Sequence, residues 1–130
     1  MPDIPRLNGA IRALDSGKPA FVTFAPGEVG TAINLSTAPY DGVVFEMEHN
    51  PYDIKTLRDC MQYMLNRKQI ATSGSVAPAV TPMVRIPPNG GEQSQWIAKQ
   101  VLDIGVYGIV WPHVSKIGRA SCRERVCLGV

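Results

Sequence analysis

Four short apolar segments, separated by stretches with helical spacing, constrain the fold of this chain more than any other feature. Apolar side chains fall on both faces of each segment, which is typical of strands in a covered parallel sheet. The predicted strands are Ala20–Ala25, Gly42–Glu46, Pro82–Ile86 and Tyr107–Trp111. We therefore expect strands and helices to alternate along the chain.

An amphipathic helix is predicted between the second and third strands. Its apolar residues recur at steps of three or four, at Ile54, Leu57, Met61, Met64 and Leu65. Asp53 is placed to cap the free amides of the first turn. The pattern predicts a helix of about four turns.

A second helix is predicted between the third and fourth strands. Its apolar positions are Trp96, Ile97, Val101 and Ile104. Gly105 suits the left-handed residue that ends a helix, and we expect Trp96 to belong to the core.

Weaker patterns predict two shorter helices and a loop. The helices are Glu28–Leu35 and Leu7–Leu14, and the loop is Ala71–Ala79, which is rich in Ser, Gly and Ala. Repeated strand–helix units with short connections require right-handed crossovers and a parallel sheet. Either an open doubly wound sheet or part of a (β/α)8 barrel satisfies this pattern, and both gather ligand chemistry at the carboxyl ends of the strands.

Composition excludes several classes of protein. The chain has 130 residues, of which 45% are hydrophobic, and a formal net charge of +2, which fits one globular domain and gives no reason to expect a nucleic-acid partner. No apolar run is long enough for a membrane span, and the first residues lack the layout of a secretory signal, so we expect a cytoplasmic protein. No glycine motif for a nucleotide and no zinc-ligand spacing is present.

Charged groups follow the second predicted strand, in the sequence Glu46-Met-Glu-His-Asn-Pro51. Strand alternation would send Glu46 and Glu48 to one side and His49 to the other. A turn at Asn50-Pro51 would let Glu46 reach the ring of His49, orient it and raise its basicity, as a general acid or base requires. The alternative is a solvated acidic loop with an incidental histidine.

Arg85 is a guanidinium within an apolar strand. Burial without a partner would be costly, so it should face a carboxylate such as Glu46 or Glu48, or bind an anionic substrate. His113 lies at the end of the fourth predicted strand, where a packing role is the simpler interpretation.

The sequence resembles the HpcH/HpaI aldolase and citrate lyase family over about Leu7 to Ser115. Three motifs carry the resemblance, namely Asp41-Gly-Val-Val-Phe-Glu-Met-Glu-His49, Pro82-Met-Val-Arg-Ile-Pro87 and the segment Leu102–Val114 that contains Trp-Pro-His. It implies a (β/α)8 TIM barrel and class II aldol chemistry. A divalent metal, Mg²⁺, Mn²⁺ or Co²⁺, would chelate a 2-oxoacid such as pyruvate, and the intact protein would form a homo-oligomer, commonly a hexamer.

By this resemblance, His49 takes the place of the proton-transfer histidine and Arg85 that of the arginine on the 2-oxoacid and its enolate. Glu46 stands where many members have an aspartate that orients the histidine. The metal ligands would lie on later strands, so none is predicted here. A full barrel has about 250 residues, so we expect residues 1–116 to be roughly the first four βα units and the chain alone to be inactive.

The tail Ile117–Val130 shows no strand or helix periodicity and looks like a translated sequencing adapter, so we expect it to be non-native. It contains Arg119, Arg123, Glu124, Arg125 and two cysteines, Cys122 and Cys127. Without it the formal net charge falls from +2 to 0, and Cys60 is the cysteine that remains.

The leading hypothesis is a fragment of an aldolase that cleaves a 4-hydroxy-2-oxoacid to pyruvate and an aldehyde. Two alternatives stay open at this point. One is a citrate-lyase-like cleavage of an acyl-CoA within the same family, and the other is a small non-catalytic α/β module that binds an anion through Arg85.

Overall fold

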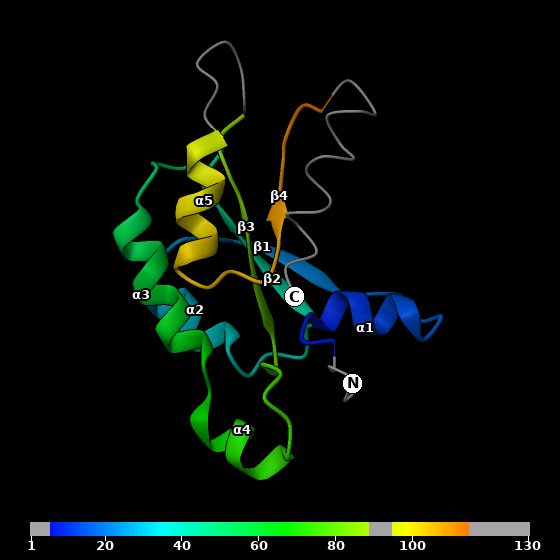
Figure 1. The fold of residues 1–130 in the computed structure, drawn as a ribbon. Helices are drawn as coiled ribbons and strands as arrows, with labels where there is room; N and C mark the ends of the chain where they lie inside the picture. The colour runs from blue at the N-terminus through cyan, green and yellow to red at the C-terminus, as the bar shows by residue number, and fades with distance from the viewer. Residues whose placement is uncertain (1–5, 89–94, 115–130) are drawn as a thin grey trace.

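Four parallel strands form one sheet, and their order in space follows their order in the sequence, β1-β2-β3-β4 (Figure 1). The computed structural model describes residues 6–88 and 95–114. The strands are β1 (Val22–Pro26), β2 (Gly42–Glu46), β3 (Thr81–Arg85) and β4 (Ile109–Val110). All four predicted strands are confirmed; the bounds of β2 agree, and the ends of the other three differ by one or two residues.

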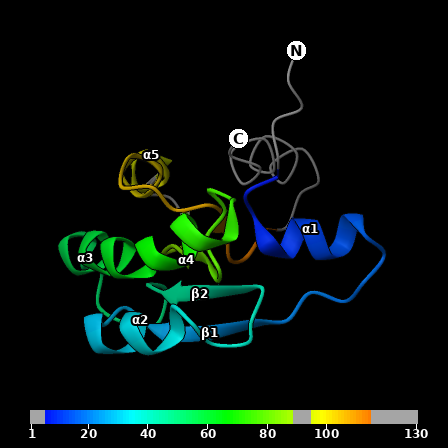
Figure 2. The same cartoon turned by 90° about the horizontal axis from the view of Figure 1, so that it is seen from below.

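Five helices are described, and three of them cover one side of the sheet. The helices are α1 (Gly9–Asp15), α2 (Val29–Leu35), α3 (Ile54–Met64), α4 (Arg67–Ser73) and α5 (Gln95–Asp103). Helices α2, α3 and α5 lie together beside the sheet, whereas α1 lies apart from them (Figure 2). A doubly wound sheet has helices on both faces and reverses its strand order, so this arrangement favours the barrel alternative.

The core lies between the sheet and α2, α3 and α5. It takes one face of each strand together with the apolar stripes of the helices. Its most buried members include Val43, Phe45, Val84, Leu57, Cys60, Met64 and Val101. Burial raises the pKa of the Cys60 thiol to about 11, so this cysteine acts as a small apolar packing residue.

Helix α3 follows the predicted pattern but is shorter than expected. The side chain of Asp53 accepts a hydrogen bond from the backbone N–H of Thr56, which confirms the predicted cap. The helix has 11 residues and ends at Met64, because Leu65 has left the helical region with ψ 88°. The four-turn prediction is therefore about one turn too long.

Helix α4 was not predicted, and it occupies the first part of the expected loop Ala71–Ala79. None of its residues is buried, so it lacks the apolar stripe that would reveal it. The residues at its two ends are nevertheless ones that commonly begin and end a helix. Asn66 caps the first turn through the N–H of Gln69, and Gly74 ends the helix with φ 66°.

The position of Trp96 corrects another expectation. Ile97 and Val101 on α5 are buried as predicted, but Trp96 is 52% exposed and its ring meets Tyr52 edge-on at 6.2 Å. Trp96 lies on the exposed face of the helix, as does Gln100 one turn later, whereas Ile97 and Val101 lie on the buried face. Gly105 adopts φ 96°, which confirms the predicted helix end.

Hydrogen bonds join the start of helix α1 to β3 and to the segment just before β4. The N–H of Gly9 donates to the buried hydroxyl of Thr81 at 2.7 Å, and the amide of Asn8 donates to the carbonyl of Tyr107 at 3.1 Å. A Cβ on Gly9 would lie 2.5 Å from the carbonyl oxygen of Asp41. This close approach requires glycine.

No helix within residues 6–88 and 95–114 is long and apolar enough to cross a bilayer. The predicted non-native tail, Ile117–Val130, lies outside the described residues, and with it Cys122 and Cys127.

Replacing Gly9 with alanine should destabilise the fold by about 1–3 kcal/mol, because backbone atoms block the new methyl group. Gly30→Ala is the matched control, since a Cβ at Gly30 meets nothing within 4 Å and Gly30 lies inside α2. The control should stabilise by about 0.5–1 kcal/mol. Urea denaturation of both variants measures the difference, and equal effects would contradict the close packing of α1.

Candidate active site

The ends of β2 and β3 bring a guanidinium against a carboxylate. Glu46 is the register partner of Arg85 in the parallel ladder, so both side chains project from the same face. Nη2 of Arg85 donates to Oε2 of Glu46, and the two side chains are 25% and 12% exposed. This hydrogen bond raises the pKa of Arg85 above its ordinary value. The predicted ion pair is confirmed.

The other carboxylate oxygen of Glu46 shapes the turn after the strand. Oε1 accepts hydrogen bonds from the backbone N–H of Glu48 at 2.6 Å and of His49 at 3.2 Å. Burial alone would raise the pKa of Glu46, but the Arg85 hydrogen bond and these two N–H groups outweigh it and hold the pKa below its ordinary value.

Glu48 connects three successive strand ends. Its side chain is only 4% exposed, and its Oε2 lies 3.1 Å from Nε of Arg85. The same oxygen lies 3.6 Å from Nε2 of His49, and Oε1 lies 2.9 Å from Nε2 of His113. The structure therefore gathers Glu46, Glu48, His49, Arg85 and His113 into one cluster, which we call the rim cluster.

The expected pairing of Glu46 with the ring of His49 is wrong in one respect. Glu46 reaches the backbone N–H of His49, whereas Glu48 lies beside the imidazole. The strand ends at Glu46 and the chain bends directly after it, which brings Glu48 inward and leaves the His49 side chain 70% exposed.

His113 joins the cluster in an unusual backbone conformation. With φ 56°, it is the one non-glycine residue with positive φ among the described positions. Its side chain is 75% exposed apart from the contact with Glu48. The sequence placed His113 at the correct rim, but no sequence signal indicated that Glu48 would bind it.

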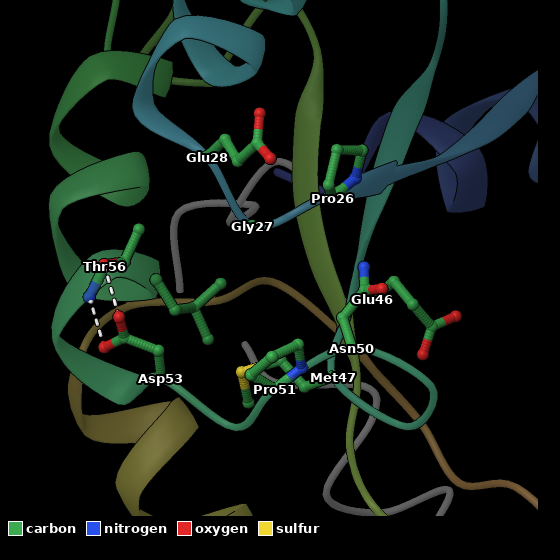
Figure 3. A pocket seen from close by; sticks show the side chains of 10 residues that line it. Pro26, Gly27, Glu28, Glu46, Met47, Asn50, Pro51, Asp53 and Thr56 are labelled. Atoms are coloured by element: carbon green, nitrogen blue, oxygen red, sulfur yellow. Dashed lines mark hydrogen bonds between the residues drawn. The ribbon is translucent and has the colours of Figure 1, made fainter.

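A cavity of about 390 Å³ opens beside this cluster, between the ends of β1 and β2 and the start of α3 (Figure 3). Glu28, Glu46 and Asp53 are among its lining residues, although the carboxylate of Glu46 points away from the other two (Figure 3). Arg85 and His49 do not line it. The cavity therefore meets the rim cluster only through Glu46, and its acidic lining does not suit an anionic substrate.

The described residues do not form a metal site. No group of three or more His, Cys, Asp or Glu side chains within 6–88 and 95–114 is arranged to hold an ion. Oε2 of both Glu46 and Glu48 faces the guanidinium of Arg85 instead.

Known proteins resemble this chain in both sequence and fold. No family model matches the chain. It is 32% identical to a hydroxypyruvate/pyruvate aldolase of Roseobacter denitrificans over 93% of the chain and 42% of that protein. It is 34% identical to a hydroxypyruvate/pyruvate aldolase of Agrobacterium fabrum over 84% of the chain and 36% of that protein. These relatives and the fold support the resemblance to the HpcH/HpaI aldolase family. The chain spans about two fifths of the curated relatives it matches.

Solved structures resemble this chain in fold. An HpcH/HpaI aldolase from Desulfitobacterium hafniense matches with a TM-score of 0.57 at 19% identity, over 90% of this chain and 39% of that one. Macrophomate synthase matches with a TM-score of 0.58 at 22% identity, over 88% of this chain and 35% of that one. The parallel four-stranded sheet and its connecting helices fit part of a (β/α)8 barrel, as the sequence predicted.

Glu46→Gln should destabilise the protein at pH 7 by about 1.5–3 kcal/mol, because it removes a charge-assisted hydrogen bond. The pKa of Glu46 is lowered in the folded state, so its stabilisation is complete above the ordinary value of 4.5 and is lost as the pH falls through the folded pKa. The difference between parent and variant should therefore shrink in acid. Urea titrations between about pH 3 and 7 measure it.

Asp59→Asn provides the control, since Asp59 forms an exposed ion pair with Arg58 on α3. Exposed pairs contribute at most about 1 kcal/mol. A Glu46→Gln effect no larger than the control, or independent of pH, would contradict the stabilising role of the Glu46–Arg85 pair.

Proposed function

We propose that this chain supplies the arginine and the proton-transfer histidine of a carbon–carbon lyase that cleaves a 4-hydroxy-2-oxoacid to pyruvate and an aldehyde. The observation that carries the proposal is the rim cluster, in which carboxylates hold Arg85 beside His49 at the carboxyl ends of the strands. Active sites of (β/α)8 barrels lie at this end. The aldolase names of the two curated relatives support the reaction class.

Arg85 would bind the 2-oxoacid unit of the substrate. One edge of its guanidinium, formed by Nε and Nη2, faces Glu48 and Glu46. No partner for Nη1 is present among the described residues. The edge that includes Nη1 would donate to the substrate carboxylate or to the oxygen on which enolate charge develops. A donor fixed before the reaction stabilises that charge without reorganisation.

His49 would move the proton of the 4-hydroxyl group. When the C3–C4 bond breaks, the hydroxyl loses its proton to the imidazole, the aldehyde leaves, and the bonding electrons remain on the pyruvate enolate. Protonation of the enolate at C3 then completes pyruvate. Glu48, beside the same ring, would orient His49 and stabilise its protonated form.

A divalent metal (Mg²⁺, Mn²⁺ or Co²⁺) remains part of the proposal for the complete barrel. It would supply additional positive charge for the 2-oxoacid. By the family resemblance, its ligands would belong to later strands.

A chimera tests the proposal. Residues 6–114 of this chain replace the matching segment of the Roseobacter denitrificans relative, and pyruvate release is assayed with Mg²⁺ or Mn²⁺. Arg85→Lys should lower kcat/KM by about 10²–10³-fold, because lysine cannot present two donors along one edge. His49→Ala should lower kcat by about 10²–10⁴-fold.

Arg58→Lys is the control, because Arg58 lies on the exposed side of α3, away from the rim cluster. It should leave turnover unchanged. Unaltered turnover in both the Arg85 and the His49 variants would defeat the proposal.

A further inference from the structure

A benzene ring lies against the face of the Arg85 guanidinium. The carbon Cζ of Arg85 lies 4.8 Å from the centroid of the Phe24 ring. Phe24 belongs to β1, two residues before Pro26, which is the register partner of Glu46. Phe24 and Arg85 thus project from the same face of the sheet, opposite the helix-covered core, although β2 separates their strands.

Phe24 lies on the face of the sheet opposite the helix-covered core. Phe24 is 55% exposed, whereas its neighbour Ala25 is only 7% exposed and belongs to the core. Phe24 does not belong to the core cluster. The contact with Arg85 is the one specific interaction of its ring among the described residues.

Three contacts together restrict the guanidinium in complementary directions. Glu46 accepts the hydrogen bond from Nη2, Oε2 of Glu48 lies 3.1 Å from Nε without a hydrogen bond to it, and Phe24 covers one face of the guanidinium plane. An arginine side chain has several rotatable bonds, so two carboxylates along one edge still allow the plane to tilt about that edge. A ring against the face opposes this tilt, and it also keeps water from one side of the ion pairs.

We propose that Phe24 is a positioning residue, which fixes the plane of Arg85 so that its open edge meets the 2-oxoacid. The inference rests on the proposed function and assigns a role to a residue that contacts neither substrate nor reacting atoms. Cation–π contacts contribute about 0.5–2 kcal/mol, which corresponds to roughly two- to thirty-fold in binding.

The first experiment uses the 130-residue chain and needs no activity. Protons held over an aromatic face are shifted upfield in NMR spectra, so the side-chain resonances of Arg85 should lie upfield of those of the exposed Arg58. Phe24→Leu should remove the shift, and Phe24→Tyr should keep it. Arg85 resonances that match those of Arg58 in the parent chain would overturn the proposal.

The second experiment measures kcat and KM in the chimera. Phe24→Leu keeps an apolar side chain of similar size but no π face, and it should raise KM for the 2-oxoacid about two- to thirty-fold with a smaller change in kcat. Phe24→Tyr should restore KM. Phe21→Leu is the matched control, because Phe21 is equally exposed at 62% and does not lie over Arg85.

Equal KM values in the parent and Phe24→Leu chimeras, or an equal loss in Phe21→Leu, would overturn the positioning role. A chimera without lyase activity before any substitution would instead defeat the proposed function. In that case the NMR comparison still decides whether Phe24 holds the guanidinium.

Discussion

The register between β2 and β3 is the constraint on which the rest of this structure depends. It sets Glu46 opposite Arg85 and, one step earlier, Phe45 opposite Val84. A shift of one residue would turn each side chain to the other face of the sheet. If β3 slipped, the guanidinium would enter the apolar core beneath the helices, and the core would lose the fully buried side chains of Val84 and Ile86. Apolar packing and ion pairing therefore select the same register.

The Glu46–Arg85 contact also determines the loop that follows. One oxygen of Glu46 binds the guanidinium, and the other accepts the N–H groups that close the turn. That turn brings Glu48 to a nearly buried position, where it meets Arg85 and both histidines. The turn that ends β2 thus also assembles the rim cluster. A change at Glu46 is therefore expected to disturb both the stability of the fold and the geometry of the rim cluster.

Much of this arrangement could be predicted from the sequence. A charged residue in an apolar strand must be paired, so Arg85 indicated its carboxylate partners, and strand alternation placed Glu46 and Glu48 on its side. Which of Glu46 and Glu48 lies beside the His49 ring depends on the turn after β2. The alternation of side chains along a strand does not predict the path of that turn. Helix α4 has caps at Asn66 and Gly74 but no apolar stripe. Phe24 resembled any other strand residue, since its contact with Arg85 crosses an intervening strand.

The charges of the rim cluster explain why Arg85 needs help to hold an anionic substrate. Two carboxylates and one guanidinium sum to −1, and a 2-oxoacid adds another negative charge. In the partly buried environment of Glu46 and Glu48, like charges a few ångströms apart repel by several kcal/mol, at an effective dielectric constant of about 20. Further positive charge must therefore meet the substrate at this rim. In the proposed complete barrel, a divalent cation held by other strand ends would supply two units. The metal proposed for the complete barrel therefore meets an electrostatic requirement that Glu46 and Glu48 create when they fix Arg85.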